Sequence, residues 1–194
     1  MQKKLFSKKI NKQNGFTIIE TMIAVSLFLI VVVIGIGSLL NTTSLNRKSQ
    51  DTRSIMDNLS FIMEDMSKNL RTGYDYHCSN SLSNLSTPLS CASGGGIISF
   101  KSSSDGSQWV YEILSDGTLQ KSISGGAAGT FVTLTPPEIK ISPTSSFSVT
   151  GAEAGDNLQP FVTIKLIGTI TSENNVITPF SLQTSVSQRM IDIQ

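Results

Sequence analysis

The residues with the most unusual placement in this sequence are Phe16 and Glu20, at the start of a long apolar run. From Phe16 to Leu40 the only ionisable side chain is Glu20, and every other residue is apolar, Gly, Ser or Thr. An uncompensated carboxylate in hydrocarbon costs roughly 3 kcal/mol or more, so an acid in such a run is a candidate functional residue. The run itself contains no cationic side chain that could pair with this acid.

Cleavage of the chain after Gly15 would supply the missing cation. The new α-amino group of Phe16 would have a reference pKa of about 8 and would be mostly protonated at pH 7. Phe16 and Glu20 are one helical turn apart, so the pair could form within one chain or between neighbouring chains. The helix dipole also favours an acid in the first turn. The chemistry predicted here is proteolytic processing followed by charge pairing.

The element that positions this pair is predicted to be a transmembrane helix over residues 16–40. At a rise of about 1.5 Å per residue, roughly 25 helical residues cross a bilayer core of about 30 Å. Residues 1–15 carry five lysines and no acid, which predicts a cytoplasmic N-terminus and an exported remainder. The alternative is a plain signal-anchor helix with Glu20 snorkelling to the membrane surface, which leaves both Gly15 and Glu20 unexplained.

The hexapeptide Gly15-Phe16-Thr17-Ile18-Ile19-Glu20, behind a basic leader and before an apolar helix, resembles that of type IV prepilins and type II secretion pseudopilins. The resemblance implies that a membrane prepilin peptidase and methyltransferase cuts between Gly15 and Phe16 and methylates the new Phe16 amine. It implies that Glu20 is the assembly carboxylate, which pairs with the N-terminus of a neighbouring subunit. The implied partners are other pilin or pseudopilin subunits, an inner-membrane assembly platform and the lipid bilayer.

The resemblance also implies a fold and a location. The expected fold is α+β: a long N-terminal helix, with a membrane half and an amphipathic half, packed on an antiparallel β-sheet head. The expected segments are a cleaved leader (1–15), a transmembrane and assembly helix (16–40), an amphipathic helix (41–72) and a β-rich head (73–194). The protein is expected to cross the inner membrane once, with its head exported, and then to enter a filament in the periplasm or on the cell surface.

The amphipathic half of the helix is predicted independently from spacing. Ile55, Leu59, Ile62, Met66 and Leu70 recur at intervals of three and four residues, which predicts one apolar stripe on a helix. The glycine that follows, Gly73, is predicted to cap the helix C-terminus.

The head is predicted to be mostly β-structure. Residues 97–100, 108–114 and 118–123 read as a meander separated by Asp-Gly turns, and 161–170 with 177–188 as a long hairpin. The alternation in 108–114 predicts a half-buried strand, with Trp109 and Tyr111 as core residues rather than a ligand platform. The Ser/Asn/Thr/Gly-rich stretch after Tyr74 predicts a loop, and Gly94-Gly95-Gly96 a flexible connector. The latter lacks the Gly-Lys-Ser/Thr of a phosphate loop.

Two further sites are considered in the head. Cys78 and Cys91 are predicted to form a disulfide, because an exported domain lies in an oxidising compartment; two reduced thiols are the alternative. Glu153, Asp156 and Asn157 could offer oxygen ligands to calcium, but the EF-hand spacing is absent and a solvated loop is preferred. No other metal site and no cofactor is expected.

Composition and charge exclude several classes of function. The formal net charge of +1 becomes −4 once five leader lysines are removed, and no basic stripe remains, so no nucleic-acid partner is predicted. His77 is the only histidine and has no acid placed for a catalytic triad, so no enzyme is predicted. We expect a minor subunit that initiates or caps a filament. The alternatives are a major pilin, or a pilin whose head is an adhesin or a DNA- or substrate-binding module.

The preference for a minor subunit depends on the head. The Ser/Gly-rich head suits a low-copy subunit, and the segment 183–189 is similar to the closing strand of J-class minor pseudopilins. The sequence does not distinguish a retractable pilus, a secretion pseudopilus and a competence filament.

Overall fold

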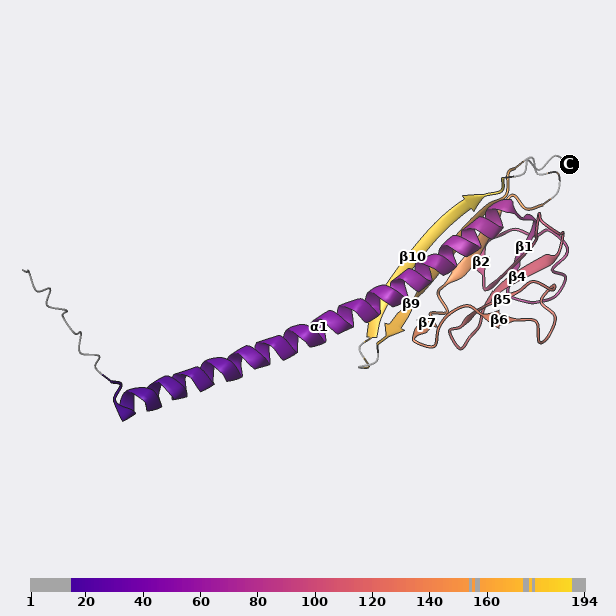
Figure 1. The fold of residues 1–194 in the computed structure, drawn as a ribbon. Coiled ribbons are helices and arrows are strands. Elements are labelled where there is room, and N and C mark those ends of the chain that lie inside the picture. Colours follow the sequence, from indigo (N-terminus) through magenta and orange to yellow (C-terminus); the bar gives the residue numbers. More distant parts are fainter. Residues whose placement is uncertain (1–14, 154, 156–157, 173–174, 176, 190–194) are drawn as a thin grey trace, which may run out of the picture. The chain divides into compact units, whose positions relative to one another are not determined.

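The computed structural model describes residues 15–153, 155, 158–172, 175 and 177–189. These residues form one long helix, α1 (Ile18–Thr72), followed by β-strands (Figure 1). The chain divides into two compact units, Met1–Arg47 and Lys48–Gln194, and the division falls inside α1. The second unit therefore contains the last turns of α1 together with all the strands, which is the α+β fold that the sequence predicts.

The second half of α1 turns one apolar stripe toward the strands. Leu59, Met66 and Leu70 have no exposed surface, and Ile62 and Met63 are each 8% exposed. Spacings of three and four residues place such side chains on one side of an α-helix, where they can pack together against a sheet. The predicted amphipathic stripe is confirmed.

The structure requires a glycine after the helix, at Gly73, for a different reason from the one that we predicted. The Gly73 N–H donates to the Asn69 carbonyl at 3.0 Å, which closes the last turn. Gly73 does not adopt a positive φ, so no left-handed cap requires a glycine here. Instead, a Cβ at this position would lie 2.3 Å from Cδ2 of Phe100. Glycine is needed because the Phe100 ring packs directly against the backbone.

The strands form two antiparallel sheets. Sheet A has the order β1-β3-β4-β5-β6, and sheet B has the order β10-β9-β8-β2, with β7 also paired to β9. Sheet A contains β1 (Tyr74–Ser79), β3 (Ile97–Lys101), β4 (Gln108–Ile113), β5 (Leu119–Ser122) and β6 (Val132–Thr133). Sheet B contains β2 (Cys91–Gly95), β7 (Ile139–Ile141), β8 (Ser146–Thr150), β9 (Phe161–Thr171) and β10 (Ile177–Ser187).

The predicted meander and hairpin are confirmed. Strands β3, β4 and β5 are consecutive neighbours in sheet A, joined by turns at Gly106 and Gly117, where φ is positive. Strands β9 and β10 pair without interruption from Phe161↔Ser187 to Thr171↔Ile177. Figure 1 shows this hairpin alongside the second half of α1.

The loop predicted after Tyr74 is wrong, because β1 and β2 lie in this stretch. Small residues permit a close approach of strands here. A Cβ on Gly95 would lie 2.6 Å from the Ser79 carbonyl oxygen, and a Cβ on Gly94 would lie 2.9 Å from Cβ of Ser146. Gly94 and Gly95 are therefore strand residues, packed where β1, β2 and β8 meet, and Gly96 forms the bend between β2 and β3.

The prediction that 108–114 is a half-buried strand is also wrong, because sheet A is covered on both faces. Tyr111 belongs to the main core, which joins the α1 stripe to the inner faces of both sheets, and its ring stacks on Phe100 at 5.9 Å. Val110, on the opposite face, is buried in a second cluster with Leu85 and Ile97. The segment 80–90 lies over this outer face. The alternation of apolar and polar residues along one strand does not show that another segment covers its outer face.

Trp109 lies at the margin of the main core. Its ring is half-buried and 6.0 Å from the Phe100 ring, and its indole N–H donates to Oγ of Ser107 at 2.8 Å. Lys121 places Nζ 4.1 Å from the centroid of the same ring, a cation–π arrangement. Trp109 is thus occupied by contacts within the head.

Candidate functional site

The residues at the start of α1 form an N-terminal cap that includes Glu20. Thr17 precedes the helix, and its Oγ1 accepts a hydrogen bond from the Glu20 N–H at 3.3 Å. The Thr17 carbonyl accepts from the Thr21 N–H at 3.2 Å, which is the first bond of the helix. Thr17 is therefore the N-cap, and Glu20 is the third residue of the helix.

The sequence analysis did not predict this cap. A threonine followed three residues later by a glutamate is the capping-box pattern, of which the structure contains the bond from the Glu20 N–H to the Thr17 hydroxyl oxygen. The Thr17-x-x-Glu20 spacing in the sequence was sufficient to find it. A test of Glu20 must therefore separate helix capping from the charge that the carboxylate carries.

Gly15, Phe16 and Thr17 lie before the helix with no secondary structure, and all three are exposed. A Cβ on Gly15 would meet no atom within 4 Å. The fold itself therefore does not require glycine at this position. The peptide bond between Gly15 and Phe16 lies in this exposed segment.

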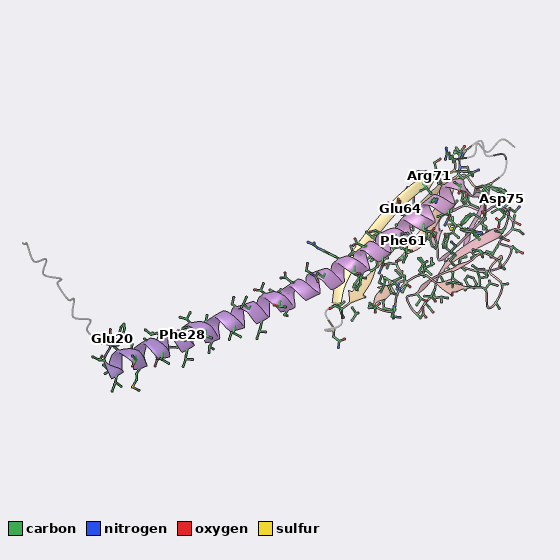
Figure 2. The ribbon with its side chains drawn as sticks, in the orientation of Figure 1. Glu20, Phe28, Phe61, Glu64, Arg71 and Asp75 are labelled. Atoms are coloured by element: carbon green, nitrogen blue, oxygen red, sulfur yellow. A yellow bond between two sulfur atoms is a disulfide. The ribbon has the colours of Figure 1, made fainter. Side chains whose placement is uncertain are left out.

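The helix that follows has the length and composition of a membrane span. The segment Ile18–Asn46 contains an 18-residue window with a mean hydropathy of 2.9, and nothing within the described chain buries that window. Figure 2 shows the labelled side chains of Glu20 and Phe28 projecting from this part of α1, and Phe28 is 65% exposed. Such a surface needs lipid or other apolar helices to cover it.

Several hydroxyl groups within this span form hydrogen bonds inside the helix. The hydroxyls of Thr21, Ser26 and Thr43 donate to carbonyls one turn earlier, each at 2.8 Å. Polar groups that bond within their own helix can lie in hydrocarbon at low cost. Glu20 remains the one ionisable side chain between Phe16 and Asn46.

Glu20 thus needs a partner from outside the side chains of its own helix. The leader residues 1–14, with their lysines, lie outside the described residues. The nearest group that could become cationic is the backbone nitrogen of Phe16, one turn earlier, once the bond to Gly15 is cut. The arrangement can therefore bind a cationic N-terminus, either its own or that of a second subunit.

A comparison with known families covers this region. Residues 10–36 match the family model of the prokaryotic N-terminal methylation motif. This segment is a type IV pilin-like methylation motif. The match covers Gly15, Phe16 and Glu20 together with the first half of the apolar helix. No curated protein and no solved structure matches the chain. The methylation motif therefore identifies the N-terminal region, and the head is interpreted from its own structure.

In the head, Cys78 and Cys91 form the predicted disulfide, with their Cα atoms 5.5 Å apart. Cys78 lies in β1 of sheet A, and Cys91 lies in β2 of sheet B. The bond therefore joins the two sheets and closes the segment 79–90, whose Leu85 covers the outer face of sheet A. Its position indicates a stabilising role.

Of the three calcium candidates, only Glu153 is described; Asp156 and Asn157 lie outside the described residues. The Glu153 carboxylate accepts hydrogen bonds from the Ser90 N–H, at 2.8 Å, and from the Ser90 hydroxyl. These bonds lower the pKa of Glu153. Within the described residues, no group of three or more His, Cys, Asp or Glu side chains could hold a metal ion. Glu153 therefore links the segment after β8 to the segment before β2 through its bonds to Ser90.

His77 is buried in β1 and forms a hydrogen bond to the backbone of a neighbouring segment. Its Nδ1 lies 2.6 Å from the Thr87 carbonyl oxygen, so this nitrogen carries the proton that is donated. Its Nε2 is buried and has no hydrogen-bond partner among the described residues. The ring helps to hold the segment 80–89 against β1.

Proposed function

We propose that this chain is a minor pilin or pseudopilin that is cut between Gly15 and Phe16 and then initiates or caps a type IV pilus-like or type II secretion-like filament. The observation that carries the proposal is the methylation motif over residues 10–36, in which Glu20 is the only acid of an exposed apolar helix. Membrane insertion without assembly explains the helix but leaves the acid without a partner.

The proposed chemistry follows from the cap and the exposed bond. A prepilin peptidase cuts after Gly15 and methylates the new amine of Phe16, which stays cationic because a secondary amine is still basic. The Glu20 carboxylate of an incoming subunit then pairs with this amine on a neighbour. In hydrocarbon, where both charges are poorly solvated, their pairing guides one helix beside another.

The proposed location is the inner membrane, crossed once, with the N-terminus in the cytoplasm and the head exported. The five lysines of residues 1–15 support this orientation. The disulfide between Cys78 and Cys91 supports an oxidising compartment for the head. The assembly platform and neighbouring pilins are the partners that this location implies.

The experiment that tests the proposal is mass spectrometry of the protein purified from membranes of cells that contain a prepilin peptidase. We expect the wild-type chain to begin at an N-methylated Phe16. The variant Gly15→Leu should keep its leader, because the peptidase would no longer accept the site. The matched control is Gly37→Leu, since Gly37 lies farther along the same helix and also has open space around it; it should be processed normally.

A wild-type protein that begins at Met1 or Gln2 would contradict the proposal. The role as a minor subunit is tested separately, by quantitative proteomics of sheared filaments. A low copy number relative to a dominant subunit is expected. Thousands of copies per filament would favour the alternative of a major pilin.

A further inference from the structure

A cavity of about 430 Å³ lies where the two sheets meet. Three segments surround it: the end of β2 with Gly96, the end of β4 with the following turn, and the loop that leads into β8. Its volume is within the range of about 300–1,000 Å³ that small-molecule sites occupy. The wall is therefore built from sheet A and sheet B together, close to the disulfide that joins them.

Several polar groups of this cavity are free to bind, whereas the hydroxyls of Thr144 and Ser145 already have partners. Within the described part of the chain, the hydroxyls of Ser93, Ser115 and Ser146 have no hydrogen-bond partner, although all three line the cavity. The Oδ1 atom of Asn80 accepts from the Gly96 N–H at 2.8 Å, which leaves the Asn80 amide N–H groups available. The site thus offers donors and acceptors from three different segments.

Apolar side chains also line this cavity. Ile113 and Leu114 are half-buried, and Pro143 is exposed at its edge. A ligand with one apolar face and several hydroxyls on its edge would match this mixed lining.

The charge of the lining selects against ions. None of the described residues that line the cavity is acidic or basic. The run Gly94-Gly95-Gly96 leads directly into β3 rather than into a helix, so no helix N-terminus faces the cavity to attract a phosphate. A charged ligand would lose hydration here without gaining a countercharge. A neutral ligand would not bear this cost.

We infer that this cavity binds a neutral saccharide, one pyranose ring that is either free or at the end of a polysaccharide. A sugar ring combines an apolar C–H face with a rim of hydroxyls, and the cavity offers both kinds of contact: Leu114 and Pro143 for the apolar face, and the free serine and asparagine groups for the hydroxyls. Gly96 leaves room for the ring to approach the backbone. This inference concerns the head alone and does not depend on processing at Gly15 or on filament assembly.

The test uses the full-length protein in a detergent without a sugar headgroup, because glycosidic detergents would compete. The probes are the methyl glycosides of neutral hexoses and N-acetylhexosamines, their oligosaccharides, and a methyl glucuronide as the charged analogue. Saturation-transfer NMR detects binding, and titration gives each dissociation constant. We expect at least one neutral probe to bind and the glucuronide to bind more weakly. Binding of the methyl glycosides would indicate a free sugar as the ligand. Binding of oligosaccharides alone would indicate the end of a polysaccharide.

Two variants assign the binding to this cavity. Ser115→Ala removes a free hydroxyl, and its matched control Ser181→Ala removes an exposed hydroxyl of β10 that lies outside the cavity. Gly96→Val fills the cavity: a Cβ on Gly96 would lie 3.6 Å from Oδ1 of Asn80 and 3.7 Å from the Ile113 carbonyl oxygen, which are ordinary contacts. We expect Gly96→Val to weaken binding by about 10-fold or more. Ser115→Ala should weaken it about 3-fold or more, and Ser181→Ala should leave it unchanged.

The inference fails if no neutral probe binds the wild-type protein, if the glucuronide binds most tightly, or if both cavity variants bind as the wild type does. Thermal melts followed by Trp109 fluorescence show whether each variant is folded. If Gly96→Val does not fold, the comparison of Ser115→Ala with Ser181→Ala decides alone.

Discussion

The hydroxyl of Tyr76 closes the C-terminal end of α1, and its removal is the sharpest test of how the head is held together. The side chain is 1% exposed, and its hydroxyl oxygen lies 2.5 Å from the Leu70 carbonyl oxygen and 2.7 Å from that of Gly73. The Leu70 carbonyl is one of the last four of the helix, which have no intrahelical N–H partner. Tyr76→Phe deletes this hydrogen-bond donor and leaves the ring in place.

The expected cost follows from the burial of the acceptor. A buried polar group that loses its partner destabilises a protein by about 1–3 kcal/mol. The ring of Tyr76 keeps its contact with Phe100, at a centroid distance of 6.3 Å, so no packing loss is added. We expect the free energy of unfolding of the head to fall by about 2 kcal/mol. For a unit of this size, the melting temperature should fall by about 4–8 °C.

The assay is urea and thermal unfolding of the full-length protein in detergent micelles. Trp109 is the only tryptophan, and it lies in the head, so its fluorescence reports head unfolding and not the membrane helix. The matched control is Tyr74→Phe. The Tyr74 ring is half-buried, and its hydroxyl makes no hydrogen bond to any described residue, so this variant should unfold as the wild type does.

The same phenol predicts a pH dependence with a definite sign. Burial raises the pKa of Tyr76 above its ordinary value, so the folded head holds the neutral phenol. A group whose pKa is raised by folding stabilises the fold below its unfolded pKa, here about 10, and this contribution is lost as the pH rises above it. Tyr76→Phe should therefore show a smaller loss of stability between about pH 10 and 11. Equal stability of Tyr76→Phe and Tyr74→Phe at neutral pH would refute the role of the hydroxyl.

Two further outcomes are expected in the head. Replacing Cys78 and Cys91 with serine should lower the free energy of unfolding by about 3 kcal/mol. Urea unfolding of the wild type in reductant should show the same decrease. An unchanged stability of the double variant would contradict a structural role for the bond. Because the bonds from Ser90 lower the pKa of Glu153, the charged carboxylate stabilises the head above its unfolded pKa of about 4.3 and loses this effect as the pH falls. Glu153→Gln should lower the free energy of unfolding by less than about 1 kcal/mol at pH 7, since the group is exposed. At pH 3 the variant should be as stable as the wild type. A difference in stability that persists at pH 3 would contradict this role of the charge.

The helix and the hairpins could be predicted from the sequence because their patterns are local. The stripe that includes Leu59 and Met66 repeats with the period of a helix, and the Asp-Gly turns at Gly106 and Gly117 define the meander. The glycine-rich strand β2 could not be predicted in this way. Its place in sheet B depends on the close approach of Ser79 and Ser146, which are distant in sequence.

The candidate site shows the same division. Gly15, Phe16 and Glu20 could be identified from the sequence, because a single acid in an apolar run can be recognised without knowledge of the fold. The roles of Gly73 and of Val110 could not, because each depends on a contact from another element: the ring of Phe100 in one case and the segment that carries Leu85 in the other. The sequence also contained the Thr17-x-x-Glu20 cap, a local pattern that was overlooked because the charge of Glu20 dominated the interpretation.

The most direct test of the central claim is the incorporation of Glu20→Gln into filaments, measured by quantitative mass spectrometry of sheared filaments against the membrane pool. Glutamine keeps the backbone N–H that bonds to Thr17 and the capping-box pattern, but removes the charge. If the carboxylate pairs with the cationic Phe16 amine of a neighbour, Glu20→Gln should be processed normally and enter filaments about 10-fold less than the wild type, as Glu20→Ala should. Normal incorporation of Glu20→Gln would show that assembly does not need the charge of Glu20, and would contradict the account.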